Sequence, residues 1–278
     1  MHLNVTVYND PTQFLEVCKP VLEQHAAVNN GVLSMIALIE GGSDIFELPA
    51  WQATIEDNGR IIGCACHSKP DGLQLTVIPD EAVPLLFAAI DRDIGMPHRI
   101  LANENNSRRL AQLWKEERGA TVTLSTEWHV YQLHKVVPPK RRANGELRKA
   151  RNDELDLVAN WGRHYGDEKP APVDVSDFMV RKLRDGNLFV WDDEGARTIL
   201  ALSGHIDKCS RISAIYTPPE FRGRGYGSTA TADLSQRQLD KGCEVVTLSA
   251  MIGDPSERIY IALGYEEIST RLCYLLEK

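Results

Sequence analysis

Residues 212–227 read ISAIYTPPEFRGRGYG, and this stretch decides how the rest of the chain is interpreted. Its apolar start predicts a strand, Pro218 and Pro219 predict a turn, and residues 222–227 form a glycine-rich loop with two arginines that opens into a helix. Backbone N–H groups in such a loop, together with the positive end of the following helix, can bind phosphate groups. The stretch therefore predicts a strand, a loop and a helix that hold a phosphorylated ligand.

Two well-known phosphate loops do not fit these residues. A dinucleotide-binding fingerprint needs glycines at its first, third and sixth positions, but Gly223 and Gly225 are followed by Ser228 at the sixth. Its acidic ribose ligand also belongs at the far end of the next strand, whereas Glu244 lies at the start of one. A Walker loop ends in Lys followed by Ser or Thr, and this loop has neither pair.

Two interpretations of the loop remain. One is a tight surface turn that is rich in glycine and arginine. The other is a pyrophosphate site, in which glycines let the backbone approach the ligand, the helix adds its positive end and the arginines offset phosphate charge. The strand before the loop and the helix after it favour the second. Its ligand-binding residues are then Arg222, Gly223, Arg224, Gly225, Tyr226 and Gly227.

A second short motif lies downstream, where residues 253–264 read GDPSERIYIALG. Asp254 can cap a helix, Pro255 suits its first position, Glu257 can complete a capping box and Gly264 can end it. The motif predicts a short helix with sharp limits.

The pattern Arg222-x-x-Gly225-x-Gly227, the preceding IYTPPEF and the later SERIYIALGYE together resemble the GNAT superfamily of acyl-CoA-dependent N-acyltransferases, from about Leu147 to the end of the chain. The resemblance implies that the loop binds the pyrophosphate of acetyl-CoA. It also implies that the strand before the loop pairs, through its backbone, with the pantetheine arm and the acyl carbonyl. The residues of that strand are Ala214, Ile215 and Tyr216.

The resemblance further implies a catalytic role for Tyr260, which corresponds to the tyrosine that protonates the departing thiolate. Attack of an amine on a thioester needs a proton for the sulfur, and a phenol within hydrogen-bond distance can give it. Backbone amides at the end of the strand would polarise the carbonyl. The alternative is that Tyr260 simply packs in its helix beside Ile259 and Leu263. The chain departs from the family at Gly253 and Glu257, where asparagines are frequent, so we predict no cofactor contact from these two side chains.

The expected secondary structure follows one plan twice. In the first half, helices are expected at 11–22, 32–39, 83–94 and 107–118, and strands at 51–56, 60–67, 73–79, near 100, 121–124 and 128–136. In the second half, helices are expected at 152–165, 173–183, 226–241 and 253–264, and strands at 147, 187–191, 199–206, 211–216, 244–249 and 268–276. We therefore predict a mixed α/β fold of two GNAT-like domains, each with a mixed, mostly antiparallel central sheet flanked by helices.

We predict a GNAT-like domain at residues 1–136, a linker at 137–144 and a catalytic, cofactor-binding domain at 145–278. The two copies differ at the loop. After the strand that ends at Pro79, the first half has two carboxylates, Asp80 and Glu81, and no glycines, and carboxylates repel phosphates. Ala111 stands where the second half has Tyr260. The first half is interpreted as a degenerate copy without the cofactor loop.

The 278 residues, of which 43% are hydrophobic and 25% charged, suit a globular chain of two domains. A formal net charge of −8 opposes general binding of nucleic acid. The basic segment at 140–151 has no interleaved aromatic residues and is expected to be a solvated linker rather than a nucleic-acid site.

The six scattered cysteines are expected to be reduced, mostly buried thiols. The sequence shows neither a leader nor a long apolar run, so we expect no membrane contact and a cytoplasmic location. We also expect no metal.

The acceptor of the acyl group is expected near the first two helices of the second half, where Trp161, Tyr165, Asp167 and Glu168 gather. Acidic residues near aromatic ones suit a cationic amine, and solvated helix ends explain them equally well. The resulting prediction is an N-acetyltransferase that transfers an acetyl group from acetyl-CoA to a primary amine of a small molecule or peptide by direct attack. The alternative is a non-catalytic CoA-binding module with a regulatory or interaction role.

Overall fold

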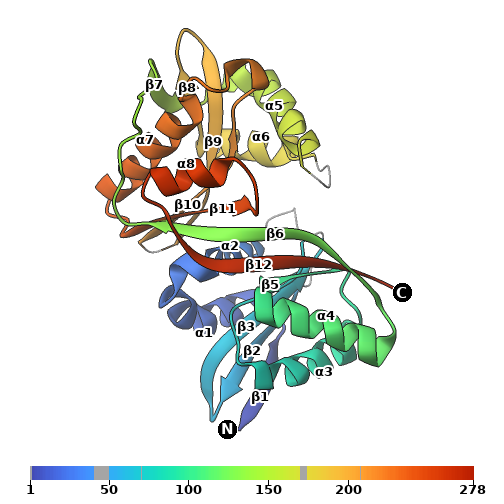
Figure 1. Cartoon of the computed structure of the whole chain (residues 1–278). Helices are drawn as coiled ribbons and strands as arrows, with labels where there is room; N and C mark the ends of the chain where they lie inside the picture. Colours follow the sequence, from blue (N-terminus) through green and yellow to red (C-terminus); the bar gives the residue numbers. More distant parts are fainter. Residues whose placement is uncertain (1, 41–49, 70, 170–173, 207) are drawn as a thin grey trace. The chain divides into compact units, whose positions relative to one another are not determined.

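The computed structural model describes residues 2–40, 50–69, 71–169, 174–206 and 208–278 (Figure 1). The chain forms two compact units. Unit 1 comprises Met1–Val130 together with Ile268–Lys278, and unit 2 comprises Tyr131–Glu267. These units differ from the predicted limits of 1–136, 137–144 and 145–278 at residues 131–144, which belong to unit 2, and, more importantly, at residues 268–278, which belong to unit 1.

The strands of unit 1 lie in the order β1-β2-β3-β4-β5-β12-β6. Among the pairs whose register is described, β4 with β5 is parallel and the others are antiparallel. The predicted pair of strands at 121–124 and 128–136 is one continuous strand, β6. The bounds are β1 Leu3–Tyr8, β2 Trp51–Asp57, β3 Arg60–Ser68, β4 Gly72–Leu75, β5 Arg99–Asn103, β6 Thr121–Leu133 and β12 Glu266–Glu277.

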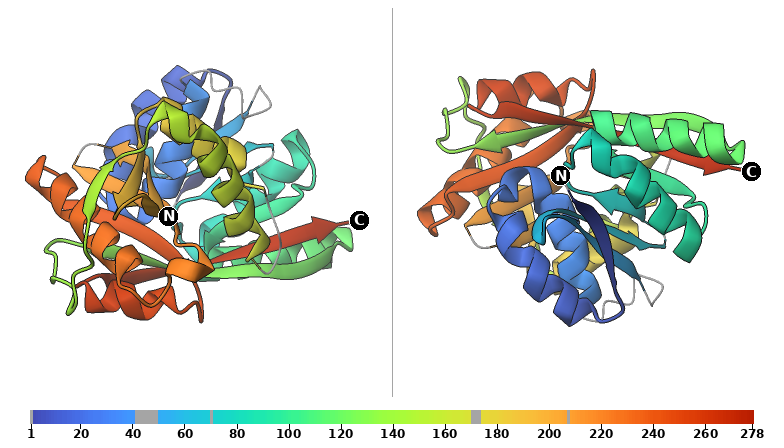
Figure 2. Two further views of the ribbon diagram at one scale, coloured as in Figure 1. Left: turned by 90° about the horizontal axis from the view of Figure 1, so that it is seen from above. Right: turned by 90° about the horizontal axis from the view of Figure 1, so that it is seen from below.

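Helices cover both faces of these strands, with α1 and α2 on one side and α3 and α4 on the other (Figure 2, right). Side chains alternate between the faces along each strand. Ala53 and Ile55 of β2 join the core that α3 and α4 cover, where Phe87 and Trp114 pack edge to face at 4.8 Å. The helices are α1 Pro11–Glu23, α2 Ala26–Glu40, α3 Val83–Asp93 and α4 Glu104–Arg118, and a short 3-10 helix, η1, spans Asp80–Ala82.

The local signals of the first half predicted its turns and helix ends well. Asn58 and Gly59 have φ of 51° and 78°, as the predicted hairpin turn between β2 and β3 requires. Gly119 ends α4 with φ of 64°. The glycines expected to end the second helix, at 41 and 42, lie outside the described residues.

The strands of unit 2 lie in the order β7-β8-β9-β10-β11, followed by the end of β6. Neighbours are antiparallel from β7 to β10, and β10 with β11 is parallel. Helices α5 and α6 lie on one side of these strands and α7 on the other (Figure 2, left). The bounds are β7 Glu146–Lys149, α5 Leu155–Asp167, α6 Ser176–Arg184, β8 Leu188–Asp192, β9 Ala196–Ile206, β10 Cys209–Tyr216, α7 Tyr226–Asp240, β11 Val245–Met251 and α8 Ser256–Ala262, with 3-10 helices η2 Asn152–Glu154 and η3 Pro219–Phe221.

The two halves of the chain exchange their last strands. The last strand of the second half pairs with a strand of the first half, and the last strand of the first half neighbours a strand of the second. β12 pairs with β5 of unit 1, with Arg271 opposite Asn103 and Leu275 opposite Arg99, and β6 neighbours β11. The hydroxyl of Ser107 reinforces this pairing, because it donates to the carbonyl oxygen of Leu272 at 3.1 Å. Our expectation that residues 268–276 complete the sheet of the second half was wrong, since an alternating pattern predicts a strand without naming its partner.

Candidate active site

The strand before the glycine-rich loop leaves its regular pairing just before the loop begins. β10 pairs with β11 from Cys209 to Arg211, and it continues beyond this pairing to Tyr216. Its register with β9 shifts after Ser213, and Ala214 has a positive φ of 49°. Bulges of this kind commonly re-aim a strand next to an active site. The predicted pantetheine-binding residues thus lie on backbone that is free of β11.

The loop itself has the backbone that its glycines require. Gly223 and Gly225 have φ of 74° and 85°, and α7 begins directly after Gly225. Because Gly225 has no side chain, it leaves the first amides of α7 without a side-chain cap. A Cβ at Gly225 would lie 3.2 Å from the carbonyl oxygen of Arg141, and one at Gly227 would lie 3.2 Å from the hydroxyl of Thr217. These glycines fit a loop whose backbone binds a phosphate group.

Arg222 is fixed at the start of the loop. Its Nε donates to the carbonyl oxygen of Thr217 at 2.8 Å, and its Nη2 donates to both carboxylate oxygens of Glu168 at 2.7 and 2.8 Å. Its guanidinium also lies over the ring of Tyr216, 5.8 Å from the centroid. Arg222 was predicted from the sequence as a site residue, but its partnership with Glu168, which lies 54 positions away in the chain, was not.

Tyr226 and Arg224 differ in what they can offer a ligand. The hydroxyl of Tyr226 donates to Oδ2 of Asp193 at 2.5 Å, and this carboxylate raises the pKa of the phenol. Only 7% of Tyr226 is exposed, so its backbone rather than its ring is available to the loop. Arg224 is exposed and keeps its side chain at the loop surface.

Tyr260 lies on α8 and faces the core of unit 2. It is 6% exposed and lies between Tyr131 and Tyr265, with ring centroids 6.2 and 6.1 Å away. Burial raises its pKa well above the usual value, so the phenol is protonated in the neutral range. Leu263 belongs to the same buried cluster as Tyr260, whereas Ile259 is 39% exposed, so the alternative that Tyr260 simply packs in the core keeps Leu263 as its support and loses Ile259.

Glu257 holds the start of α8 through two hydrogen bonds. Its Oε1 accepts from the hydroxyl of Tyr131 at 2.8 Å, and its Oε2 accepts from the backbone N–H of Gly253 at 2.9 Å. Asp254 accepts from the N–H of Ser256 at 2.8 Å, but α8 begins at Ser256 with Pro255 at its N-cap, one residue later than predicted. The sequence carries no signal for the role of Tyr131, because this residue comes from β6, far away in the chain.

An aromatic group from α5 packs against the end of β10. Trp161 and Tyr165 meet the ring of Tyr216 edge to face, at 6.2 and 6.1 Å. The ammonium of Lys169 lies 4.1 Å from the centroid of Tyr165. The structure therefore brings Trp161 and Tyr165 to the strand that carries the predicted acyl-binding residues, and it brings Glu168 to the loop.

The chain after β4 in unit 1, which corresponds to the chain after β10, is bonded to a side chain of α4. After β4, the backbone N–H of Ile78 donates to Oδ1 of Asn106 at 3.0 Å, and Nδ2 of Asn106 donates to the carbonyl oxygen of Ile78 at 2.9 Å. Pro84 lies in the first turn of α3, where it offers no N–H group. The backbone N–H and carbonyl groups of Ile78 are thus both satisfied by Asn106.

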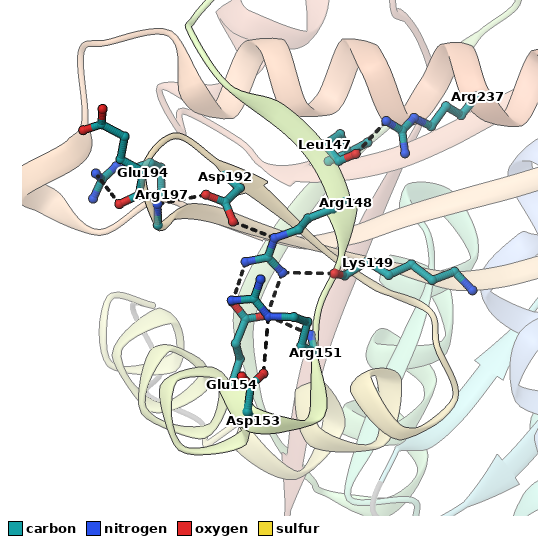
Figure 3. Close-up of polar contacts among 11 residues, drawn as sticks. Leu147, Arg148, Lys149, Arg151, Asp153, Glu154, Asp192, Glu194, Arg197 and Arg237 are labelled. Carbon is teal, nitrogen blue, oxygen red and sulfur yellow. Dashed lines mark hydrogen bonds and ion pairs between the residues drawn. The ribbon is translucent and has the colours of Figure 1, made fainter.

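The basic segment after residue 140 is tied to carboxylates of unit 2 (Figure 3). Nη1 and Nη2 of Arg148 donate to Glu154 at 2.8 and 2.6 Å, and its Nε donates to Asp192 at 2.6 Å. Only 18% of the Arg148 side chain is exposed. Arg142 makes two bonds to Asp233, at 2.6 and 2.7 Å. Arg148 thus anchors β7 and η2 rather than lying in a solvated linker.

Two negative findings concern the described part of the chain alone. Within it, no helix is long and apolar enough to cross a membrane. The same residues contain no group of three or more His, Cys, Asp or Glu side chains placed to hold a metal ion. All six cysteines are buried thiols, as predicted.

Comparison with known proteins places this geometry in a fold family. Residues 199–274 match the family of FR47-like proteins. No curated protein matches the sequence significantly. Solved structures match over almost the whole chain: a protein from Drosophila has a TM-score of 0.66 at 15% identity, covering 98% of both chains. A tandem GNAT protein from the clavulanic acid biosynthesis pathway has a TM-score of 0.61 at 15% identity, with 98% of both chains covered.

A GNAT-family acetyltransferase from Colwellia psychrerythraea has a TM-score of 0.57 at 13% identity, covering 99% of this chain and 100% of that one. The chain thus has the same mixed α/β fold as these solved proteins, which include GNAT proteins, over almost its whole length. The predicted fold class and the resemblance in fold are confirmed.

Proposed function

We propose that the chain is an N-acetyltransferase that transfers an acetyl group from acetyl-CoA to a primary amine of a small molecule or peptide. The observation that carries the proposal lies in unit 2. There β10 separates from β11 just before a glycine loop opens α7, which leaves strand backbone and loop amides together for one extended ligand. The GNAT fold of the chain supports an acyl-CoA ligand at this place.

The residues present suit acetyl-CoA. In the proposal the pyrophosphate lies against the loop amides and the positive end of α7, with Arg224 offsetting its charge. The pantetheine arm pairs with the backbone of residues 214–216 as an added strand would. Gly225 is essential because a side chain there would meet the backbone of Arg141.

The proposed chemistry is direct transfer. Acetyl-CoA supplies a thioester carbonyl, and the neutral amine nitrogen attacks the carbonyl carbon. A C–N bond forms, the C–S bond breaks, the sulfur leaves as a thiolate, and the nitrogen loses one proton to water. Backbone amides at the end of β10 polarise the carbonyl, and Tyr260 gives its proton to the sulfur. Its raised pKa keeps the phenol in the protonated form that a proton donor requires. We assign no general base.

The second candidate is a CoA-binding module without turnover. It is favoured by α8, where Gly253 and Glu257 replace asparagines frequent in the family, and where Glu257 is already bonded to Tyr131. In both candidates unit 1 lacks a cofactor site. A cytoplasmic location, where acetyl-CoA and reduced thiols occur, belongs to the same proposal.

One experiment separates the two candidates. Thiol release from acetyl-CoA is measured with a panel of amines that includes polyamines, aminoglycosides, amino acids and a peptide with a free N-terminus, and CoA binding is measured in parallel by calorimetry. Turnover with any amine supports the enzyme. Tight CoA binding without turnover on the whole panel supports the module, and the absence of CoA binding overturns both.

A further inference from the structure

Unit 2 contains a hollow at the end of α7 that is remote from the glycine loop. The hollow has a volume of about 420 Å³ and lies among the end of α6, the far part of β9 and the end of α7. Because α7 spans 15 residues, the two ends of this helix are about 22 Å apart. The residues that line the hollow are Lys182, Asn187, Leu202, Ser203, Gly204, Gln238 and Lys241.

The strand order explains why the hollow exists. β8 begins at Leu188, and the backbone N–H of Leu202 donates to the carbonyl oxygen of Asn187 just before this start. β9 continues beyond Leu202 as far as Ile206. An edge of β9 therefore runs past its neighbour, and the ends of α6 and α7 flank it.

Among the described residues that line the hollow, two are lysines and none carries a carboxylate. Lys182 lies in the last turn of α6, and Lys241 caps α7. Neither ammonium has an ion pair within the described part of the chain, and that of Lys182 lies 5.6 Å from the ring centroid of Phe178. Burial lowers the pKa of Lys182, and the negative charge of Asp185 opposes this shift only in part. Helix C-termini carry partial negative charge and favour cations, so an anion in this hollow would be bound by the two ammonium groups and not by the helix ends.

Two buried polar atoms at the hollow lack a partner. The hydroxyl of Ser203 and the Nε2 of Gln238 are both buried without a hydrogen bond. Gln238 is 4% exposed, and its Oε1 accepts from the hydroxyl of Ser210 at 3.2 Å, which leaves the NH₂ end unsatisfied. Buried polar groups without partners are rare in folded proteins, and each calls for a partner such as solvent or a ligand.

We propose that this hollow is a second ligand site of unit 2, which binds the phosphate group of a small phosphorylated metabolite. Two unpaired ammonium groups supply the charge, and side-chain N–H and O–H groups supply the hydrogen bonds. Lysine binds phosphate as a point charge, whereas a planar carboxylate is best matched by the fork of an arginine, and no arginine lines the hollow. The volume leaves room for a small organic group beside the phosphate. The site does not depend on the proposed function of the loop.

Calorimetric titration with glycerol 3-phosphate, and with malonate as the carboxylate probe, tests the proposal on the full chain. The test variant is the double substitution Lys182→Met and Lys241→Met, because methionine keeps the apolar stem and removes the charge. Lys208→Met is the matched control: this lysine also belongs to unit 2, but it is exposed and pairs with Glu244. Ser203→Ala is a milder second variant that removes an unpaired hydroxyl.

We expect wild type and Lys208→Met to bind glycerol 3-phosphate equally, the double variant to lose affinity by a factor of about ten or more, and Ser203→Ala to lose a smaller factor. Any phosphate that binds at the glycine loop is retained in all variants, so the difference reports the hollow alone. Equal affinity in the folded double variant and in Ser203→Ala, an absence of phosphate binding in wild type, or tighter binding of malonate would each overturn the proposal.

Discussion

Arg222 and Glu168 form a two-pronged ion pair between the glycine loop and the end of α5, with Nη2 at 2.7 and 2.8 Å from the two carboxylate oxygens. The side chains are 47% and 42% exposed, so the pair adds little to folding stability. The pair matters because the carboxylate of Glu168 holds the guanidinium of Arg222 at the loop and offsets its charge. A phosphate at the loop must share the guanidinium with a carboxylate that is already bonded to it.

This competition predicts the effect of Glu168→Gln. Removing the carboxylate frees Arg222 for the pyrophosphate, and CoA should bind more tightly by about 1 kcal/mol, roughly fivefold. Calorimetry with CoA measures the change. Asp167→Asn is the matched control, because it removes the neighbouring charge but leaves the ion pair intact. Weaker binding by Glu168→Gln would show instead that Glu168 positions Arg222 for the ligand.

The close approach at Gly225 predicts a large effect on the same binding. Valine at this position suffers strain from the positive φ and meets the carbonyl oxygen of Arg141. CoA affinity should fall about 100-fold or more, because several phosphate hydrogen bonds of roughly 1.5–3 kcal/mol each are lost.

Gly242→Val is the control for strain alone. Gly242 has a φ of 100°, no atom lies within 4 Å of the place that a Cβ would take, and it follows the opposite end of α7. Both valines should lower stability by about 1–2 kcal/mol, but only Gly225→Val should lose CoA. Normal affinity in Gly225→Val rules out the loop as the pyrophosphate site.

Tyr260→Phe tests the proposed acid. It should lower kcat by about 100-fold or more and leave CoA affinity nearly unchanged, since the ring stays in place and only the proton is lost. Tyr265→Phe is the control: its hydroxyl shares a hydrogen bond of 2.8 Å with Ser235, away from the sulfur in the proposal. Steady-state kinetics with the best acceptor amine decides, and unchanged turnover in Tyr260→Phe contradicts the assignment.

His67 predicts a pH dependence in unit 1. Burial, together with the positive charges of His98 and Lys69, lowers the pKa of His67 from 6.5 to about 4. The unfolded chain therefore binds a proton more readily than the folded one, so stability is present above the unfolded pKa and is lost as pH falls from 6.5 towards 4.

Urea unfolding at about pH 7 and about pH 4.5 measures this loss. His67→Gln should show a smaller difference between the two pH values than wild type. His134→Gln, in unit 2, should keep the wild-type difference. An equal difference in His67→Gln and wild type excludes His67 as its source.

Local signals explain most of what the sequence predicted. Asn58 and Gly59 define a turn by their own backbone preferences, and Gly225 and Asp254 mark helix starts through groups one or two residues away. These effects act within a few residues, so they can be read without knowing the fold.

The features that were missed depend on partners distant in the chain. No residue close to Arg222 in the chain identifies Glu168 as its partner, and none close to Tyr260 identifies Tyr131. The apolar alternation of 268–276 fits any strand edge equally well. Side-chain patterning thus predicted that β12 is a strand, and only the three-dimensional structure shows which unit it stabilises.

The place of β12 predicts where its core residues act. Leu276 is 4% exposed in the core of unit 1, and its backbone N–H donates to the carbonyl oxygen of His98 at 3.0 Å. Leu276→Ala should cost about 2–5 kcal/mol through lost burial and a cavity, and the loss should fall on unit 1. Leu275→Ala is the matched control, because Leu275 is 36% exposed and its substitution should cost much less stability.

Hydrogen exchange followed by mass spectrometry locates the effect: protection should fall in β5 and α4, while β10, α7 and CoA binding stay close to wild type. Loss of protection in β11 and α8 instead would mean that β12 supports unit 2 after all, as the chain order alone suggested.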